Sequence, residues 1–261
     1  MEEIERLKEA IKGRGKLLVL FSGGGDSTLL VKLAHDVLGN KAVALTIDSP
    51  VTLRSEIKQS KELAEIIGVK HEIIELDELK SEHLIKNPPD RCYLCRKLRD
   101  GVVKNWAAER KFEAIADGLN YSDLGDYRPG VKASTEDGIW HPFMEFKVTK
   151  ESIREYSRFL NLRTWSMPSM ACLASRFPYG FGLTRERVER VEKAEEFLRG
   201  LGFKEVRVRH FPYDLASVEV EDLEKALKGK SKITLYLRSL GFSFVSIDLE
   251  GFKSGKLNRR L

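Results

Sequence analysis

The stretch from Leu17 to Leu38, LLVLFSGGGDSTLLVKLAHDVL, decides the fold of this chain. Its first part, Leu17–Phe21, is apolar at every position, which is typical of a strand that helices cover on both faces of a sheet. Glycines let the next segment turn sharply, and Thr28–Leu38 has the apolar spacing of a helix. The start of a helix presents free N–H donors and the positive end of the helix dipole. We therefore expect the turn at residues 22–27 to bind an anion.

Short apolar runs alternate with amphipathic stretches from this segment onward to residue 117. The expected strands are 17–21, 42–47, 71–75 and 114–117, and the expected helices are 28–38, 54–67 and 95–110. This order predicts an α/β fold built on a doubly wound parallel sheet. Ligands bind such sheets beyond the carboxyl ends of the strands, so chemistry is expected after Phe21, Ile47 and Asp117.

The pattern changes after Leu160, where a loop leads into a charged segment. The expected elements beyond it are a helix at 185–199, strands at 205–211 and 216–220, a helical region and a last strand at 243–249. This order predicts a second, smaller α/β domain. We expect the domains to be residues 1–165 and 166–261, and we expect the smaller one to contact the substrate and other copies of the chain.

The composition is that of an ordinary globular protein. Of 261 residues, 42% are hydrophobic and 33% are charged, which excludes a disordered or low-complexity chain. The net charge of +5 permits a polyanionic partner without requiring one, and we expect phosphate binding rather than duplex binding. No apolar run approaches the roughly 18–20 residues of a membrane span, and Met1–Arg6 lacks the basic start of a signal peptide. These features predict a cytoplasmic protein.

Two common nucleotide-binding signatures do not explain residues 22–27. The Walker pattern ends in Lys and Ser or Thr, and Gly229–Ser231 lacks the strand and first glycine that should precede it; G-x-G-x-x-G is not satisfied either. The SGGGDS sequence matches SGGxDS and so resembles the PP-loop of the ATP pyrophosphatases. The resemblance implies cleavage of ATP between the α and β phosphates and adenylation of a carboxylate or carbonyl oxygen. A plain glycine turn is the alternative.

This resemblance places ATP at the carboxyl edge of the sheet. The residues that we expect to bind ATP are Ser22, Gly23, Gly24, Gly25, Asp26, Ser27, Asp48, Asp117 and Gly118. Asp26 would repel phosphates unless it orients a hydroxyl or holds Mg²⁺, so we assign it a catalytic role. Loop and helix-cap chemistry explains Asp48 equally well. Gly118 is expected where adenosine passes close to the backbone.

Three longer blocks narrow the family. They are DGLNYSDLGDYRPG at 117–130, CLASRFPYG at 172–180 and DLEGFKSG at 248–255. In this order they resemble the LarE family of ATP-dependent sacrificial sulfur transferases over nearly the whole chain. The resemblance implies that the protein uses ATP and Mg²⁺ to adenylate a carboxylate of a pyridinium mononucleotide. Sulfur then replaces an oxygen, AMP is released, and the product serves nickel-pincer cofactor biosynthesis.

The substrate implied by this resemblance carries a phosphate, which basic side chains should contact. Arg207 and Arg209 alternate along one face of an expected strand, and this spacing lets two guanidinium groups bind one anion. Arg176 follows the cysteine motif, and Lys97 lies near an expected helix start. A solvated strand face is the alternative for the strand arginines. The resemblance also places an acidic residue, Glu195, near the reactive cysteine, although its helix is rich in Glu and an ordinary surface carboxylate explains it equally well.

The chain has three cysteines, Cys92, Cys95 and Cys172, and an odd number argues against a disulfide framework. In one branch of the LarE family the cysteine at the position of Cys172 gives up its own sulfur and becomes dehydroalanine. In another branch a C-x-x-C pair, here Cys92 and Cys95, joins it to hold a 4Fe-4S cluster. We expect the second case, because three thiolates leave one iron open. Zinc or a redox pair are alternatives.

Other functions remain open. A tRNA thiolase and an ammonia-dependent ligase would both use the same ATP-binding loop, and a non-enzymatic nucleotide-binding module would leave the cysteines unexplained. The partner that we expect is a small pyridinium mononucleotide rather than a membrane or a nucleic acid. We also expect a homo-oligomer, and four aromatic residues of the smaller domain could form either its interface or the core: Phe211, Tyr213, Phe242 and Phe244.

Overall fold

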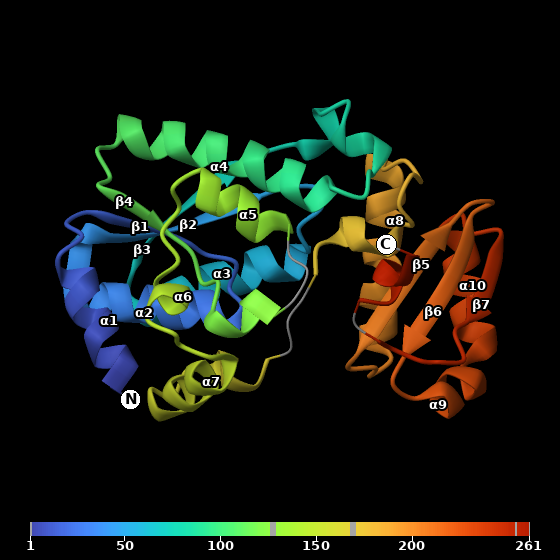
Figure 1. The fold of residues 1–261 in the computed structure, drawn as a ribbon. Coiled ribbons are helices and arrows are strands. Elements are labelled where there is room, and N and C mark those ends of the chain that lie inside the picture. Colours follow the sequence, from blue (N-terminus) through green and yellow to red (C-terminus); the bar gives the residue numbers. More distant parts are fainter. Residues whose placement is uncertain (1, 126–128, 168–170, 254, 261) are drawn as a thin grey trace. The chain divides into compact units, whose positions relative to one another are not determined.

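This computed structural model describes residues 2–125, 129–167, 171–253 and 255–260. Parts of two motifs used above, residues 126–128 and Ser254, lie outside the described residues. The chain forms two compact units, whose elements are labelled in Figure 1. The N-terminal unit is Met1–Leu76 with Asp90–Met170, and the C-terminal unit is Asp77–Pro89 with Ala171–Leu261.

The N-terminal unit is built on a four-stranded parallel sheet with the order β3-β2-β1-β4. Its strands are β1 Leu17–Leu20, β2 Ala42–Asp48, β3 Lys70–Glu75 and β4 Ala114–Ala116. In β1, Val19 lies opposite Ala44 of β2 on one side and Ala116 of β4 on the other. The chain runs outward from β1 to β3 and then returns to the other side of β1. The topological switch point, where such sheets bind ligands, therefore lies between β1 and β4.

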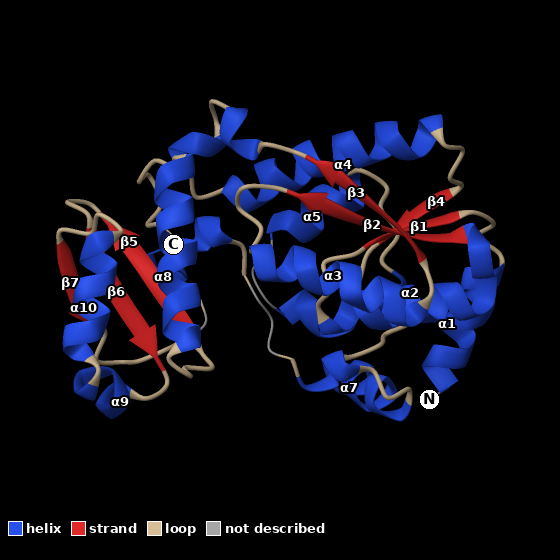
Figure 2. Ribbon diagram, turned by 180° about the vertical axis from the view of Figure 1, so that it is seen from behind, coloured by secondary structure: helices blue, strands red, loops and turns tan. Residues whose placement is uncertain are grey.

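Helices cover both faces of this sheet (Figure 2). They are α1 Glu2–Lys12, α2 Gly25–Leu38, α3 Arg54–Ile67, α4 Arg91–Glu109, α5 Pro129–Glu136, α6 Pro142–Glu145 and α7 Lys150–Phe159. Leu17 and Val19 share a core with α1, α2 and α3, whereas Leu18 packs with Val103 and Ala107 of α4. Successive residues of β1 are thus buried on opposite faces, which is why the strand is apolar at every position. The predicted α/β fold with a doubly wound parallel sheet is confirmed.

Two helices begin earlier than the sequence predicts. α2 begins at Gly25 rather than at Thr28, and α4 begins at Arg91 rather than at Cys95. Glycine and polar residues are typical of turns, and so they concealed the first turn of each helix. Cys92 therefore lies inside a helix.

The C-terminal unit contains a three-stranded sheet with the order β5-β6-β7. Its elements are β5 Val206–Phe211, β6 Leu215–Val220, β7 Phe244–Ile247, α8 Arg185–Gly200, α9 Leu223–Lys228 and α10 Lys230–Ser239. β5 and β6 are antiparallel and meet at a turn where Tyr213 and Asp214 have positive φ, while β6 and β7 are parallel. Val208 and Val218 lie opposite each other and are buried. This sheet with its helices is the smaller α/β region that the sequence predicts.

One early segment packs with the C-terminal unit. The buried Asn87 Nδ2 donates to the carbonyl of Pro178 at 2.7 Å, and the Gly180 N–H donates to the Asn87 carbonyl at 2.8 Å. The Leu183 N–H likewise donates to the Ile85 carbonyl at 2.7 Å. These bonds join residues about ninety positions apart, so local sequence patterns do not reveal them. The expected division at residue 165 assigned this segment to the first domain instead.

The aromatic residues of the C-terminal unit divide between core and surface. Phe242 is 2% exposed, whereas Phe244 is 61% and Tyr213 is 88% exposed. Core packing therefore explains the first of these residues, and the other two leave an apolar surface. Among the described residues, no helix has the length and apolar content that crossing a membrane requires.

Candidate active site

The SGGGDS loop, residues 22–27, joins β1 to α2 at the switch point of the sheet. The Gly24 N–H donates to the Ser22 Oγ at 3.3 Å, and this Oγ lies 3.1 Å from the Ser27 Oγ. The Thr28 Oγ1 donates to the Gly24 carbonyl at 2.7 Å. The hydroxyl groups thus hold the loop against the start of α2. The first N–H groups of a helix have no acceptor inside the helix, so they are suited to bind phosphate oxygens.

Two glycines of the site are required by close packing. Gly23 has φ of 76°, and a Cβ there would lie 3.1 Å from the Ser60 nitrogen of α3. A Cβ on Gly118 would lie only 2.8 Å from the Ser27 nitrogen. β4 is the neighbour of β1, so the segment after β4 packs directly on the SGGGDS loop. The structure thus gives a different reason for Gly118 from the expected passage of adenosine: the loop backbone itself leaves no room for a side chain.

Both carboxylate oxygens of Asp26 have partners. The Lys150 ammonium at the start of α7 forms an ion pair with Oδ1, and the Asn120 Nδ2 donates to Oδ2 at 3.0 Å. Asp26 lies in the first turn of α2, and its side chain is 23% exposed. The negative charge expected to repel a phosphate is therefore balanced by a lysine that is distant in the sequence.

Asp117 belongs to a buried polar network. The His141 Nδ1 lies 2.7 Å from its Oδ1, and the Arg96 Nη2 donates to its Oδ2 at 2.7 Å. Arg96 also binds Asp100 on α4 at 2.8 Å. Burial raises the pKa of Asp117, but the hydrogen bond from His141 and the charge of Arg96 outweigh burial and hold this pKa below its usual value. The Leu119 N–H donates to Oδ1 at 3.1 Å, so Asp117 shapes the backbone that follows β4.

Asp48 and Lys97, two further predicted site residues, each have an oppositely charged partner. Arg54 donates to the Asp48 Oδ1 at 2.5 Å. The Lys97 Nζ lies 2.7 Å from Asp137 and 3.5 Å from Glu136. These side chains are partly exposed, and exposed ion pairs contribute only about 0–1 kcal/mol, so a ligand could displace them at small cost.

The C-x-x-C cysteines lie in the first turn of α4. Cys92 is exposed, Cys95 is partly buried, and neither is in a disulfide. Residues three apart on a helix share a face, so both thiols lie on one side of α4. Cys172 belongs to the C-terminal unit and is also a free thiol of intermediate exposure. In the part of the chain that the structure describes, no three His, Cys, Asp or Glu side chains form a group that could hold a metal ion.

Cys172 precedes the 3-10 turn Leu173–Arg176, and Arg176 holds this turn. The Arg176 Nη1 donates to the Cys172 carbonyl at 2.9 Å, while Nε and Nη2 donate to the two oxygens of Glu195 at 2.8 and 2.9 Å. Both side chains are completely buried. Burial raises the pKa of Glu195, but the Arg176 charge and hydrogen bonds hold this pKa below its usual value. The predicted neighbour of the reactive cysteine is thus linked to it through an arginine.

The strand arginines differ in their surroundings. Arg209 binds both oxygens of Glu219, at 3.0 and 2.9 Å, and donates to the Ser175 carbonyl at 2.7 Å. The described residues place no carboxylate within ion-pair distance of Arg207; its Nη1 donates to the Val206 carbonyl at 2.9 Å. Burial, with the nearby charge of Arg176, lowers the pKa of Arg207 to about 10. Arg207 is therefore a partly buried cation whose neighbourhood would be improved by an anion.

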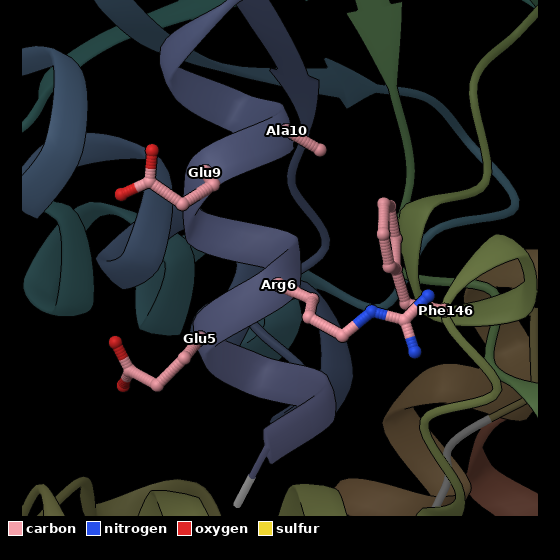
Figure 3. Close-up of a pocket in the computed structure, with 5 residues that line it drawn as sticks. All are labelled: Glu5, Arg6, Glu9, Ala10 and Phe146. Carbon is pink, nitrogen blue, oxygen red and sulfur yellow. The ribbon is translucent and has the colours of Figure 1, made fainter.

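A surface hollow elsewhere on the N-terminal unit contains none of these residues (Figure 3). It is lined by Glu5, Arg6, Glu9 and Ala10 of α1 and by Phe146. The Arg6 guanidinium lies 5.9 Å from the centre of the Phe146 ring. No predicted site residue lines this hollow, so it does not compete with the SGGGDS loop as the candidate site.

Known proteins resemble this chain over its whole length. It is 37% identical to the pyridinium-3,5-bisthiocarboxylic acid mononucleotide synthase of Lactiplantibacillus plantarum, over 98% of this chain and 93% of that protein. This chain belongs to the LarE family. It is also 38% identical to an uncharacterized protein of Synechocystis, over 99% of this chain and 98% of that protein. A family model of the queuosine biosynthesis protein QueC, which has a PP-loop, matches residues 16–89.

Membership of the LarE family confirms the resemblance seen in the sequence and identifies the SGGGDS loop as a PP-loop. Similarity to a glutamine-hydrolyzing GMP synthase of Archaeoglobus fulgidus is weaker, at 25% identity over 75% of this chain and 67% of that protein. The ammonia-dependent alternative thus corresponds to a more distant relationship than the LarE assignment does.

Sequence reasoning missed several residues of this LarE-family site. Arg96 and Lys150 were not considered, His141 was considered only as a metal ligand, and Asn120 was noted only as part of a motif. Asn120 could have been found, because it follows an expected strand at the ligand edge. Lys150 had no such signal, since its only distinction is the fold that brings it to Asp26.

Proposed function

We propose that this protein is an ATP-dependent sulfur transferase of nickel-pincer cofactor biosynthesis, which converts a carboxylate of a pyridinium mononucleotide into a thiocarboxylate. The observation that carries this function is the 37% identity to the Lactiplantibacillus plantarum synthase across 98% of the chain. A PP-loop at the switch point of a parallel sheet supplies the ATP chemistry.

The proposed reaction begins with adenylation. A carboxylate oxygen of the substrate attacks the α-phosphorus of ATP, and pyrophosphate leaves. AMP is then a good leaving group on the carbonyl carbon, so a sulfur nucleophile can replace it. Phosphate binding falls to the N–H groups of the loop, for which we propose residues 22–27. Asp48, Asp117 and Gly118 complete the proposed ATP site.

Asp26 is the residue that we propose for Mg²⁺. Carboxylate oxygens are the ligands that Mg²⁺ takes from proteins, together with substrate phosphates. The side chain lies in the first turn of α2, and its present partners are an ammonium and an amide, which a cation could replace. When bound, Mg²⁺ would neutralise the phosphate charge that adenylation moves onto pyrophosphate.

We propose Cys172 as the residue that delivers sulfur, together with Cys92 and Cys95 as holders of a 4Fe-4S cluster. The donor set supports this proposal, because all three thiols are free and two lie on one face of α4. When bound, such a cluster would supply an iron with an open position for an added sulfide. Arg176 contributes by holding the backbone of Cys172 in a fixed turn.

Arg207 is our principal candidate for the substrate phosphate. It is a partly buried cation with no carboxylate partner among the described residues, so a phosphate would remove an unfavourable burial of charge. Lys97, Arg176 and Arg209 are the further candidates, and they would first have to exchange or share their present ion pairs. Glu195, which binds Arg176, supports this arrangement from beneath the cysteine turn.

The decisive experiment is incubation of the protein with ATP, Mg²⁺, sulfide and a pyridinium mononucleotide that bears carboxylates. We expect AMP, pyrophosphate and a substrate whose mass has increased by the exchange of oxygen for sulfur. ATP cleavage stimulated by ammonium, with no change in the pyridinium nucleotide, would favour an ammonia-dependent ligase. ATP cleavage stimulated only by tRNA would favour a thiolase.

We also propose that the enzyme acts in the cytoplasm as a homo-oligomer. Phe244 and Tyr213 are large aromatic residues exposed on the C-terminal unit, and burial of such side chains drives association. Light scattering of the wild-type protein and of Phe244→Ser tests the second part. We expect the substitution to lower the molar mass in solution.

A further inference from the structure

Lys150 lies at the edge of the PP-loop, although it is 124 residues distant from Asp26 in the sequence. Its ammonium forms an ion pair with the Asp26 Oδ1. The two side chains are 22% and 23% exposed, so the pair is neither fully buried nor free in solvent. The Asn120 Nδ2 donates to the other oxygen of Asp26 at 3.0 Å.

The backbone of Lys150 is held by the segment that follows β4. The Lys150 N–H donates to the Ser122 Oγ at 3.1 Å, and the Tyr121 N–H donates to the Val148 carbonyl at 2.9 Å. Thr149 caps α7 by accepting a hydrogen bond from the Ser152 N–H at 3.2 Å. The position of the lysine is therefore set by the same segment that packs on the PP-loop.

Lys32 provides a contrast on the same helix as Asp26. It forms an ion pair with Asp36 four residues later, and its side chain is 28% exposed. Such pairs along one helix are ordinary surface features. Lys150 instead reaches Asp26 from a separate helix, at the end of α2 where phosphate-binding N–H groups gather.

We propose that Lys150 is a phosphate-binding residue of the ATP site, held in place by Asp26 until ATP binds. An ammonium has three donors, and the carboxylate needs only one of them. The ammonium lies beside the first turn of α2, so its other donors are near the place where a phosphate would bind. This inference rests on the proposed function, because it requires ATP at residues 22–27.

Equilibrium binding of ATP and of adenosine in the presence of EDTA tests the contact without metal or turnover. We expect Lys150→Met to weaken ATP binding by about 10-fold or more, because one charge-assisted hydrogen bond to phosphate is lost. Adenosine binding should stay unchanged, because adenosine has no phosphate. Lys32→Met, the matched control, should bind ATP like the wild type, and Lys150→Arg should recover part of the affinity.

A second pair of variants separates direct contact from simple neutralisation of Asp26. We expect Asp26→Asn/Lys150→Met to bind metal-free ATP about 10-fold more weakly than Asp26→Asn alone. Equal affinities would overturn the proposal, because Lys150 would then act only through Asp26. Lys150→Gln replaces the methionine variant if the latter does not fold. Failure of the wild type to bind ATP would overturn the proposed function instead, so the two failures are distinguishable.

Discussion

Arg176 donates to both carboxylate oxygens of Glu195, at 2.8 and 2.9 Å, and neither side chain is exposed to solvent. Glu195 also accepts a hydrogen bond from the Val208 N–H at 3.1 Å. The pair thus joins α8, β5 and the turn of Cys172. Removing one partner of a buried ion pair leaves the other charge uncompensated, which is much more costly than the pair is favourable.

Glu195→Gln should lower the free energy of unfolding of the C-terminal unit by about 3–5 kcal/mol, because it leaves the buried Arg176 without a counter-charge. Denaturant unfolding measures this loss. Glu196→Gln, an exposed neighbour on the same helix, should change stability by less than about 0.5 kcal/mol. Equal effects of the two substitutions would show that the Arg176 pair does not hold this region.

Arg207→Met should raise the stability of the C-terminal unit by about 1 kcal/mol or more in phosphate-free buffer, because it removes a partly buried and unpaired charge. Inorganic phosphate should raise the Tm of the wild type and have little effect on this variant, since a bound anion stabilises the folded state. Arg238→Met removes an exposed arginine of α10 and should leave the response to phosphate intact. A wild type indifferent to phosphate would remove Arg207 as an anion-binding residue.

The network around Asp117 predicts a dependence of stability on pH. The pKa of Asp117 is lowered from its ordinary value of 3.8, so its ionised form stabilises the fold. This stabilisation is complete above that value and is lost as the pH falls through the lower pKa of the folded state. Asp117→Asn should therefore be less stable near neutral pH by about 3 kcal/mol and should show a weaker loss on acidification. Asp36→Asn, which alters an exposed pair, should follow the wild-type pH profile.

Gly118→Ala should displace the PP-loop, because the new Cβ would lie 2.8 Å from the Ser27 nitrogen. We expect a loss of about 1–3 kcal/mol in stability, typical of overpacking, together with weaker ATP binding. Gly101→Ala is the matched control: Gly101 lies within α4 with open space around it, and alanine there should stabilise by about 0.5–1 kcal/mol. Normal ATP binding by the Gly118 variant would contradict the close packing of the two loops.

The fate of Cys172 distinguishes the two routes of sulfur transfer. If the three cysteines hold a cluster, anaerobically reconstituted protein should contain iron and sulfide, and Cys92→Ala, Cys95→Ala and Cys172→Ala should each lower the iron content. The intact wild-type mass should then be unchanged after turnover. If Cys172 is sacrificed, the spent protein should lose the mass of one H₂S, and the double variant Cys92→Ala/Cys95→Ala should remain active without iron.

Much of the N-terminal unit could be predicted because its signals are local. A strand that is apolar at every position, followed by glycines and a helix, specifies a buried parallel strand wherever it occurs. The expected helix at 54–67 agrees with α3 at both ends. The early starts of α2 and α4 escaped prediction because glycine and polar residues are equally at home in a turn and in the first turn of a helix.

The chemistry of the arginines was only partly visible in the sequence. Their alternation in β5 correctly places Arg207 and Arg209 on one strand, but it does not distinguish a cation committed to a carboxylate from one without a carboxylate partner. Glu219 lies on the neighbouring strand in a pairing that the sequence does not specify. The contrast between the two arginines therefore required the tertiary structure.

By itself, the sequence determined the α/β class, the PP-loop and the family, because each depends on residues adjacent along the chain. Only the tertiary structure decided that Lys150 neutralises Asp26, that Gly118 packs on the PP-loop, and that residues 77–89 belong to the C-terminal unit. These relationships join residues roughly 90 to 125 positions apart. They arise from how strands order themselves and where loops return, and no periodicity or local motif records such distances.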